Sequence, residues 1–262
     1  MANNLMQSST AKVVRDDLNV SYIGRHEAIE FVRTRVKDVD VVLDLGPGIC
    51  PQPYVQKPYV HICVDAHRPY LERLKKEVGD DPKFVFINAR WDEIIERLPD
   101  KSVDSVFALD FIEHLNKQDG FRMLREAQRV ARCQVVVYTP LGFFHQSYDD
   151  PNKPDRWGMD GGYWQTHRSG WDYDDFGPEW EFVCSPDYID LDEDNQPLEE
   201  YLPAFWAIRN LGPASERRYT VHEAPSTWLY FKKTLESGLP PTVFTGLQRA
   251  WGKLLRLTGR QN

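Results

Sequence analysis

The chain has 262 residues, of which 41% are hydrophobic and 27% charged, so it resembles neither a disordered nor a membrane-spanning chain in composition. This length allows one large α/β domain or two small ones with a sizeable core. Its formal net charge of −8 would repel a polyanion, so nucleic acid is not an expected partner.

Cysteine usage and the N-terminal segment indicate the compartment. The four cysteines, Cys50, Cys63, Cys133 and Cys184, are widely spaced without a CxxC pair, which argues against a disulfide framework or a zinc ribbon. The N-terminal segment shows no charged start followed by an apolar block and a cleavage site. We therefore expect a cytoplasmic protein.

Up to about residue 144, short β-branched runs alternate with helical stretches, which predicts a parallel sheet with right-handed crossover helices. The predicted strands are near-continuous apolar runs, as expected for strands buried on both faces. They span residues 39–45, 60–64, 84–87, 103–109 and 134–138. The predicted helices lie at residues 25–36, 68–78, 92–98 and 120–131, where apolar residues recur at helical spacing.

Beyond the fifth predicted strand, the alternation of strand-like and helical segments ends. Residues 145–180 are rich in Asp, Gly, Pro and Trp before strand-like runs return at 181–189 and 204–208, so we interpret 145–180 as a substrate-facing insertion over the edge of the sheet, within a domain of residues 1–210. Residues 211–262 carry eight Lys or Arg against three Glu. We treat them as a separate basic tail.

A glycine loop follows the first predicted buried strand and reads Asp44-Leu-Gly46-Pro47-Gly48. Without side chains at the two glycines, a ligand can approach the backbone N–H groups. Pro51 stands where a dinucleotide fingerprint needs its last glycine, and the Gly-Lys-Ser/Thr ending of a phosphate-binding P-loop is absent. Asp44 would repel a diphosphate and suits a ligand that carries an ammonium group. S-adenosylmethionine is such a ligand.

With Asp44, Gly46 and Gly48 matching its first motif, the sequence resembles the class I S-adenosylmethionine-dependent methyltransferases over roughly residues 20–144. The motif's third glycine is replaced by Cys50, and nearby prolines imply that the helix after the loop is short or broken. The resemblance implies a Rossmann-like α/β sheet and S-adenosylmethionine as the cofactor.

The same resemblance implies roles after the later strands. Asp65 would bind both ribose hydroxyls, and Asn88 would lie beside the adenine, with Arg90 or Trp91 over its face. The alternatives are that the glycines only make a turn and that Asp65 only caps the next helix. The predicted cofactor-binding set is Asp44, Gly46, Pro47, Gly48, Asp65, Ala66, Asn88, Ala89, Arg90 and Asp110.

The acceptor is predicted from the segments after the fourth and fifth strands. The fifth strand ends Thr139-Pro140, not in the Asn/Asp-Pro-Pro-Tyr/Phe that family members modifying amide or adenine nitrogens carry, which favours an oxygen acceptor. A histidine is then the expected base. We predict His167 for this role and His114 as the next candidate, with His145 third, although each could be an ordinary cap or loop residue.

The run YWQTHRSGW at residues 163–171 combines aromatic faces with Gln, Arg and Ser donors, as sugar-binding sites do. It resembles bacterial methyltransferases associated with surface-polysaccharide assembly, which implies O-methylation of a sugar or glycan intermediate. The alternatives are another small-metabolite acceptor and a cofactor-binding but catalytically idle interaction protein. Of the four tryptophans between residues 157 and 180, at least two are expected in the core.

Asp110, Glu113 and His114 are similar to the Glu-x-x-Glu-His pattern that holds magnesium in some ubiquinone-pathway and small-RNA methyltransferases. His145 or His167 would then be a further ligand. Many relatives carry Glu-His without any metal, so we assign no metal ligands here. Whether Asp110, Glu113 and His114 bind a divalent cation stays an open question at this stage.

Two terminal segments complete the predictions. Tyr22 and Arg25 could close over the cofactor carboxylate as a lid, or only begin a solvated helix. In the tail, a helix would place apolar residues on one face and basic residues on others. Such a helix could contact an anionic membrane at its inner face, or dock on the domain or on a second copy in a homodimer. Its residues are Leu247, Ala250, Trp251, Leu254 and Leu255, with Arg249, Lys253 and Arg256.

Overall fold

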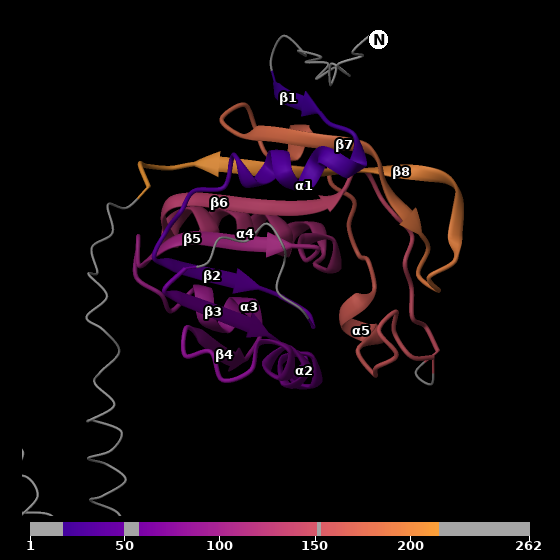
Figure 1. Cartoon of the computed structure of the whole chain (residues 1–262), viewed down its shortest axis with the longest axis horizontal. Helices are drawn as coiled ribbons and strands as arrows, with labels where there is room; N and C mark the ends of the chain where they lie inside the picture. The colour runs from indigo at the N-terminus through magenta and orange to yellow at the C-terminus, as the bar shows by residue number, and fades with distance from the viewer. Residues whose placement is uncertain (1–17, 50–57, 151–152, 215–262) are drawn as a thin grey trace, which may run out of the picture. The chain divides into compact units, whose positions relative to one another are not determined.

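The computed structural model describes residues 18–49, 58–150 and 153–214. They form an eight-stranded sheet in the order β1-β7-β8-β6-β5-β2-β3-β4 (Figure 1). The strands are β1 (Asn19–Tyr22), β2 (Val41–Leu45), β3 (Val60–Asp65), β4 (Phe84–Asn88), β5 (Val103–Leu109), β6 (Ala131–Pro140), β7 (Glu181–Leu191) and β8 (Pro197–Asn210). All five predicted strands are present, and the predicted Rossmann-like α/β class is confirmed.

The five strands from β2 to β6 are parallel, because each neighbouring pair among them runs in the same direction. The chain fills β2, β3 and β4 outward in one direction and then β5 and β6 in the other. The point where the strand order reverses therefore lies between β2 and β5. In open α/β sheets, ligands bind beyond the carboxyl ends of the strands at such a point.

Helices cover both faces of this sheet. They are α1 (Arg25–Arg33), α2 (Arg68–Val78), α3 (Trp91–Ile95), α4 (Lys117–Val130) and α5 (Gly162–Gln165), with 3₁₀ turns at Ile112–His114 and Tyr173–Asp175. One core layer joins buried residues of α3 and α4 to Leu43 and Leu45 of β2, and the other joins those of α1 to Val42. Every residue of β5 is buried, as expected for a central strand between two layers.

The remaining strands close one side of the sheet. β8 pairs antiparallel with both β6 and β7, and β1 adds parallel to β7 at the edge. The sequence prediction missed β1, whose four residues are too short for a clear periodic signal. The antiparallel β7–β8 pair also lies outside the predicted parallel pattern.

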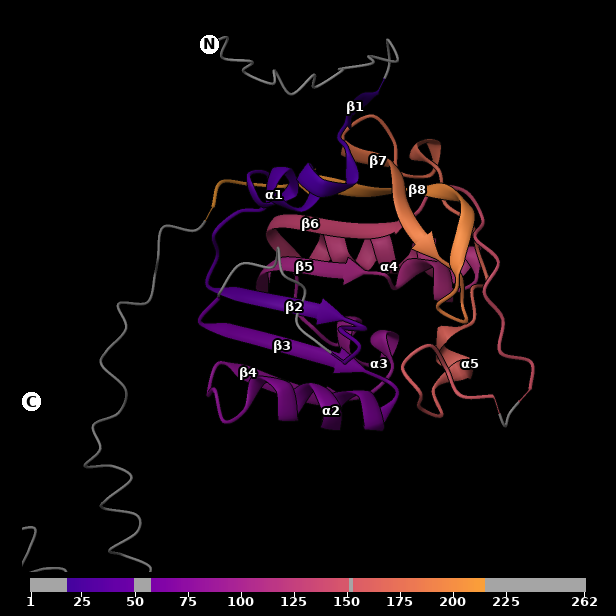
Figure 2. The same ribbon diagram turned by 45° about the vertical axis from the view of Figure 1, so that its right-hand side comes forward.

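The insertion lies beyond the carboxyl ends of β2, β3 and β5, where α5 and its flanking loops face the ends of the strands in both views (Figures 1 and 2). The sequence analysis placed this segment over the edge of the sheet, and the edge that it faces is the one formed by the carboxyl ends of the strands. Trp171 and Trp180 of this segment are buried in the core, which confirms the expectation for two of the four tryptophans.

Among the described residues, no helix has the length and hydropathy needed to cross a bilayer. The tail helix predicted around residues 247–256 lies outside the described residues, as do Cys50 and Pro51. The membrane and homodimer hypotheses for the tail therefore stay predictions.

Candidate active site

A cavity of about 280 Å³ opens at the reversal point of the strand order. Four successive strand-to-helix connections line it, together with aromatic residues of the insertion. Every predicted cofactor-binding residue except Asp44 and Asn88 is among its lining residues. These are Gly46, Pro47, Gly48, Asp65, Ala66, Ala89, Arg90 and Asp110.

The glycine loop requires both of its glycines. Gly46 and Gly48 have φ angles of 65° and 66°, a left-handed conformation that side chains disfavour. A Cβ on Gly46 would lie 2.2 Å from the Phe111 ring, and one on Gly48 would lie 2.8 Å from the Trp157 ring. Two aromatic rings therefore pack directly on the loop backbone, one from the segment after β5 and one from the insertion.

Asp65 ends β3 and faces the cavity while being only 8% exposed. Its Oδ1 accepts a hydrogen bond from the backbone N–H of His67 at 2.8 Å, and the N–H of Gly48 also donates to it. Burial nevertheless raises the pKa of Asp65 to about 7. The carboxylate thus stabilises the loop before α2 without capping the helix, because the N-cap residue is His67 and no side chain caps α2. Asp65 also presents an acceptor to a ligand.

Asp44 does not reach the cavity. Its buried Oδ2 lies 2.9 Å from Nε2 of His61 on β3, so a pairing between neighbouring strands takes the place of the predicted ligand contact. Asn88 is also absent from the cavity lining. Its Nδ2 donates to the carbonyl oxygens of Asp65 and Ala66 at 2.9 and 3.0 Å. Asn88 therefore holds the loop that carries the predicted ribose acceptor.

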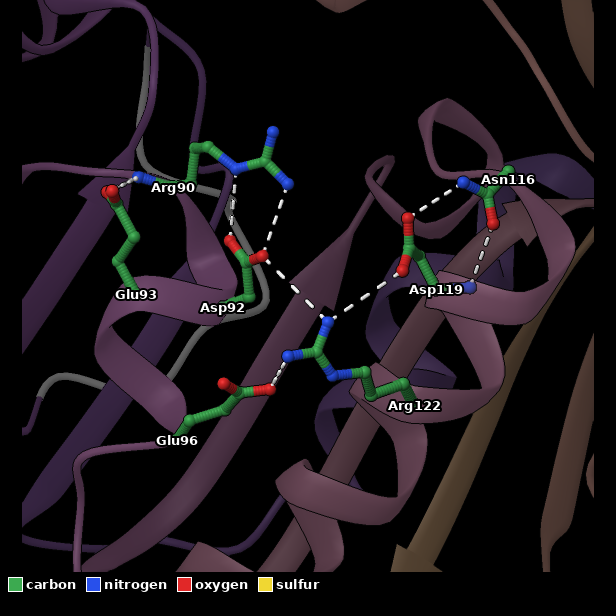
Figure 3. A network of polar contacts seen from close by, with 7 residues as sticks. All are labelled: Arg90, Asp92, Glu93, Glu96, Asn116, Asp119 and Arg122. Atoms are coloured by element: carbon green, nitrogen blue, oxygen red, sulfur yellow. Dashed lines mark hydrogen bonds and ion pairs between the residues drawn. The ribbon is translucent and has the colours of Figure 1, made fainter.

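A polar network fixes the rim of the cavity between α3 and α4 (Figure 3). The Arg90 guanidinium donates to the Asp92 carboxylate at 3.1 Å. Arg122 contacts Asp92, Glu96 and Asp119, and Asn116 caps α4 by accepting from the N–H of Asp119. Exposed ion pairs contribute little stability individually, so the main effect of the network is to orient Arg90 at the rim.

In the segment after β5 and the insertion, Glu113, His114 and His167 come together, although only His114 lines the cavity. The two imidazole rings lie 4.9 Å apart between centroids. Nδ1 of His114 faces the carbonyl oxygen of Thr166 at 3.4 Å, and Nδ1 of His167 faces that of Phe144 at 2.8 Å. A carbonyl can only accept, so in both rings we assign the proton to Nδ1 and the lone pair to Nε2.

Burial shifts the pKa values of His114, His167 and Glu113 toward their neutral forms. Burial, reinforced by His167, lowers the pKa of His114 to about 4, and burial also lowers the pKa of His167. Burial and the nearby Asp110 raise the pKa of Glu113 well above its usual range. Nε2 of His114 and both Glu113 oxygens lack a hydrogen-bond partner of normal geometry. At neutral pH the imidazole of His114 is therefore neutral, and its Nε2 is buried without a partner.

The predicted lid residues lie elsewhere. The Arg25 guanidinium is 2.5 Å from Oδ2 of Asp190 and stacks over the Tyr201 ring, and neither Arg25 nor Tyr22 lines the cavity. His145 is likewise absent from the lining. Conversely, the sequence analysis did not predict the lining residues Tyr70, Phe111 and Asn116, nor a cofactor-side position for Trp157.

Residues 43–138 match a family model described as a methyltransferase domain. The match runs from β2 to β6 and includes the glycine loop, Asp65 and the turn that carries His114. The protein is thus a methyltransferase. S-adenosylmethionine is its cofactor, and eight of the ten predicted cofactor residues meet in the cavity at the carboxyl ends of the strands.

Three solved structures show the range of likeness. A methyltransferase from Archaeoglobus fulgidus that depends on S-adenosylmethionine is 16% identical, with a TM-score of 0.43 over 70% of this chain and 94% of that one. A putative methyltransferase from Bacillus halodurans is 11% identical, with a TM-score of 0.48 over 72% and 100% of the two chains. Magnesium protoporphyrin IX methyltransferase from Synechocystis is 12% identical, with a TM-score of 0.41 over 70% and 78%. No curated protein matches the sequence. Likenesses at this level say nothing about the acceptor.

Proposed function

We propose that this methyltransferase transfers the methyl group to a hydroxyl oxygen of a sugar or glycan intermediate. One observation carries the proposal: His114 lines the cavity that the predicted cofactor loop also lines, and burial keeps its imidazole neutral, with a buried Nε2 that has no hydrogen-bond partner. Methyl transfer to a hydroxyl needs a proton acceptor at that position. Another small metabolite with a hydroxyl group is the alternative acceptor.

The acceptor half of the cavity consists of insertion residues. Tyr163, Trp164, Gln165 and Arg168 line it, and the Arg168 guanidinium stacks 4.6 Å from the Tyr163 ring centroid. Arg168 also donates to the carbonyl oxygen of His114 at 2.8 Å. The same side chain therefore contacts both the Tyr163 ring and the backbone of the proposed base. Aromatic faces with adjacent amide and guanidinium donors suit a polyol, which has apolar C–H faces and hydroxyl edges.

In the proposed reaction, the acceptor oxygen attacks the methyl carbon in line with the sulfonium. The carbon–sulfur bond breaks with its electron pair staying on sulfur, which gives S-adenosylhomocysteine, and the hydroxyl proton is accepted by the imidazole of His114. The protein contributes mainly by positioning the acceptor and by accepting the proton. A sulfonium becomes a neutral thioether in this step, so no metal or redox partner is required for its balance.

The acceptor class is tested with the full-length protein, S-adenosylmethionine and a panel of sugars, nucleotide sugars, amines and phenols. We expect S-adenosylhomocysteine to form with a sugar acceptor, and a methyl ether in the product by mass spectrometry. Trp164→Ala should raise the acceptor KM about tenfold, the upper range for loss of an aromatic contact, whereas Tyr201→Ala, an exposed aromatic outside the cavity, should not. A methylated nitrogen in the product would contradict the proposal.

The resemblance also suggests a divalent cation, and the group formed by Glu113, His114 and His167 has the ligand atoms to bind one. Glu113, His114 and His167 each offer a ligand atom, all within 4.8 Å of one another, and both histidines have the carbonyl-bound N–H that metal-ligating histidines use. Asp110, which the sequence pattern included, is not in this group. Bound there, a cation would lower the pKa of the acceptor hydroxyl.

Exhaustive chelation of the full-length protein distinguishes the two arrangements. If His114 acts as a base without a metal, the enzyme keeps its turnover after chelation. If a cation bound by Glu113, His114 and His167 is needed, the enzyme loses turnover and regains it with Mn²⁺. The Mn²⁺ electron paramagnetic resonance signal reports binding without an activity assay. Glu113→Gln should remove that binding, because the substitution keeps the shape of the side chain and removes its charge.

A further inference from the structure

Residues 155–161 of the insertion fold around one buried carboxylate. Asp155 is 4% exposed, and its Oδ1 accepts from the N–H groups of Trp157 and Met159, both at 2.9 Å. Its Oδ2 accepts from the N–H of Gly161 at 3.1 Å and from the Tyr70 hydroxyl. These four donors satisfy the carboxylate. The loop conformation therefore depends on this side chain, because its buried N–H groups would otherwise lack an acceptor.

Tyr70 joins this loop to α2. Its ring is 1% exposed and packs edge-on against Trp157, with centroids 4.8 Å apart. Burial and the Asp155 carboxylate raise the pKa of Tyr70, so its hydroxyl stays protonated and donates. A Cβ on Gly161 would lie 1.7 Å from that hydroxyl oxygen. The close approach of the loop to α2 therefore requires a glycine at this position.

Trp157 connects the ordered loop to the cofactor cavity. Its ring packs on the backbone of the glycine loop so closely that a Cβ on Gly48 would lie 2.8 Å from it. Trp157, Tyr70 and Gly48 all line the cavity, whereas Asp155 does not. The wall that faces a ligand is thus aromatic, and the group that holds it in place lies behind it.

We propose that Asp155 is a positioning residue for the cofactor: it fixes Trp157 over the glycine loop and so completes the S-adenosylmethionine site from within the insertion. The insertion then has two roles, because residues 155–161 complete the cofactor half of the cavity and residues 163–168 the acceptor half. The inference concerns the cofactor half and does not depend on the identity of the acceptor.

The test compares two carboxylates of the same loop. In Asp155→Asn, an amide N–H₂ replaces one of the two acceptor oxygens and the negative charge is lost, which weakens the hydrogen bonds that hold the loop of Trp157. The calorimetric dissociation constant and the KM for S-adenosylmethionine should rise about fivefold, the cost of ordering one side chain on binding, while kcat at saturating cofactor stays within twofold. Asp160→Asn is the matched control. Asp160 also reaches α2, through Nε2 of His67 at 3.0 Å, but its side chain is 82% exposed, so affinity should not change.

A second comparison separates positioning from general stability. If Asp155 acts through Trp157, then Trp157→Leu should weaken cofactor binding at least as much as Asp155→Asn, and combining them should add nothing further. The inference is overturned by wild-type affinity in folded Asp155→Asn, or by losses that add fully in the double variant. Should thermal melting show that Asp155→Asn does not fold, Trp157→Leu alone decides. It removes the ring that packs on the glycine loop, and wild-type affinity in that variant would also overturn the inference.

Discussion

Replacing His114 with alanine is expected to lower kcat by about 100-fold to 10,000-fold, the usual contribution of a general base. His114 lines the cavity, and its neighbours Glu113 and His167 do not, so neither is placed to replace it as the proton acceptor. Steady-state turnover at saturating S-adenosylmethionine measures the loss. Calorimetry should show that the cofactor still binds.

His167→Ala provides the comparison, because the sequence analysis placed this histidine first. His167 does not line the cavity, and its Nδ1 is held by the carbonyl oxygen of Phe144. The variant should therefore lose less turnover than His114→Ala. Because the pKa of His114 is about 4, its imidazole stays neutral from pH 6 to 8. The kcat profile should then show no acidic limb near pH 6.5, and a larger loss in His167→Ala would reverse the assignment.

Asp65→Ala is expected to weaken S-adenosylmethionine binding roughly 10-fold to 150-fold, which corresponds to about 1.5–3 kcal/mol for a hydrogen bond to a charged group. Asp65 stands at the end of β3 with its carboxylate in the cavity wall. The variant also loses the acceptor for the N–H of His67, so thermal melting is needed beside calorimetry to confirm that it folds.

The pH dependence of binding gives a sharper test of the same residue. Ribose hydroxyls donate to the ionised carboxylate, so binding favours the ionised form and should weaken as pH falls through the pKa of about 7. The dissociation constant at pH 6 should be about tenfold higher than at pH 8. In Asp65→Asn this difference should disappear. Equal pH dependence in both proteins would place the titrating group elsewhere.

Sequence reasoning predicted the sheet because its central strands are continuous apolar runs, and it predicted most of the cavity because ligand-binding residues follow such strands. It did not predict the pairing of Asp44 with His61, because this pairing depends on strand register: Asp44 lies opposite Cys63 on β3, two residues after His61. A spacing pattern carries no such information. For the same reason, the approach of Trp157 to Gly48 and of Tyr70 to Asp155 could not be predicted, since each joins segments that are distant along the chain.

The strand order also constrains how copies of this protein can associate. β1 and β4 stand at the two edges of the described sheet and have four and five residues. Short edge strands offer few free N–H and C=O groups to another chain, and this limits sheet extension between molecules. Lys83 precedes β4 with a charged side chain, a further obstacle to an incoming strand. The edges of the described sheet thus offer an incoming strand only a short row of backbone partners, which opposes the growth of a continuous sheet between molecules.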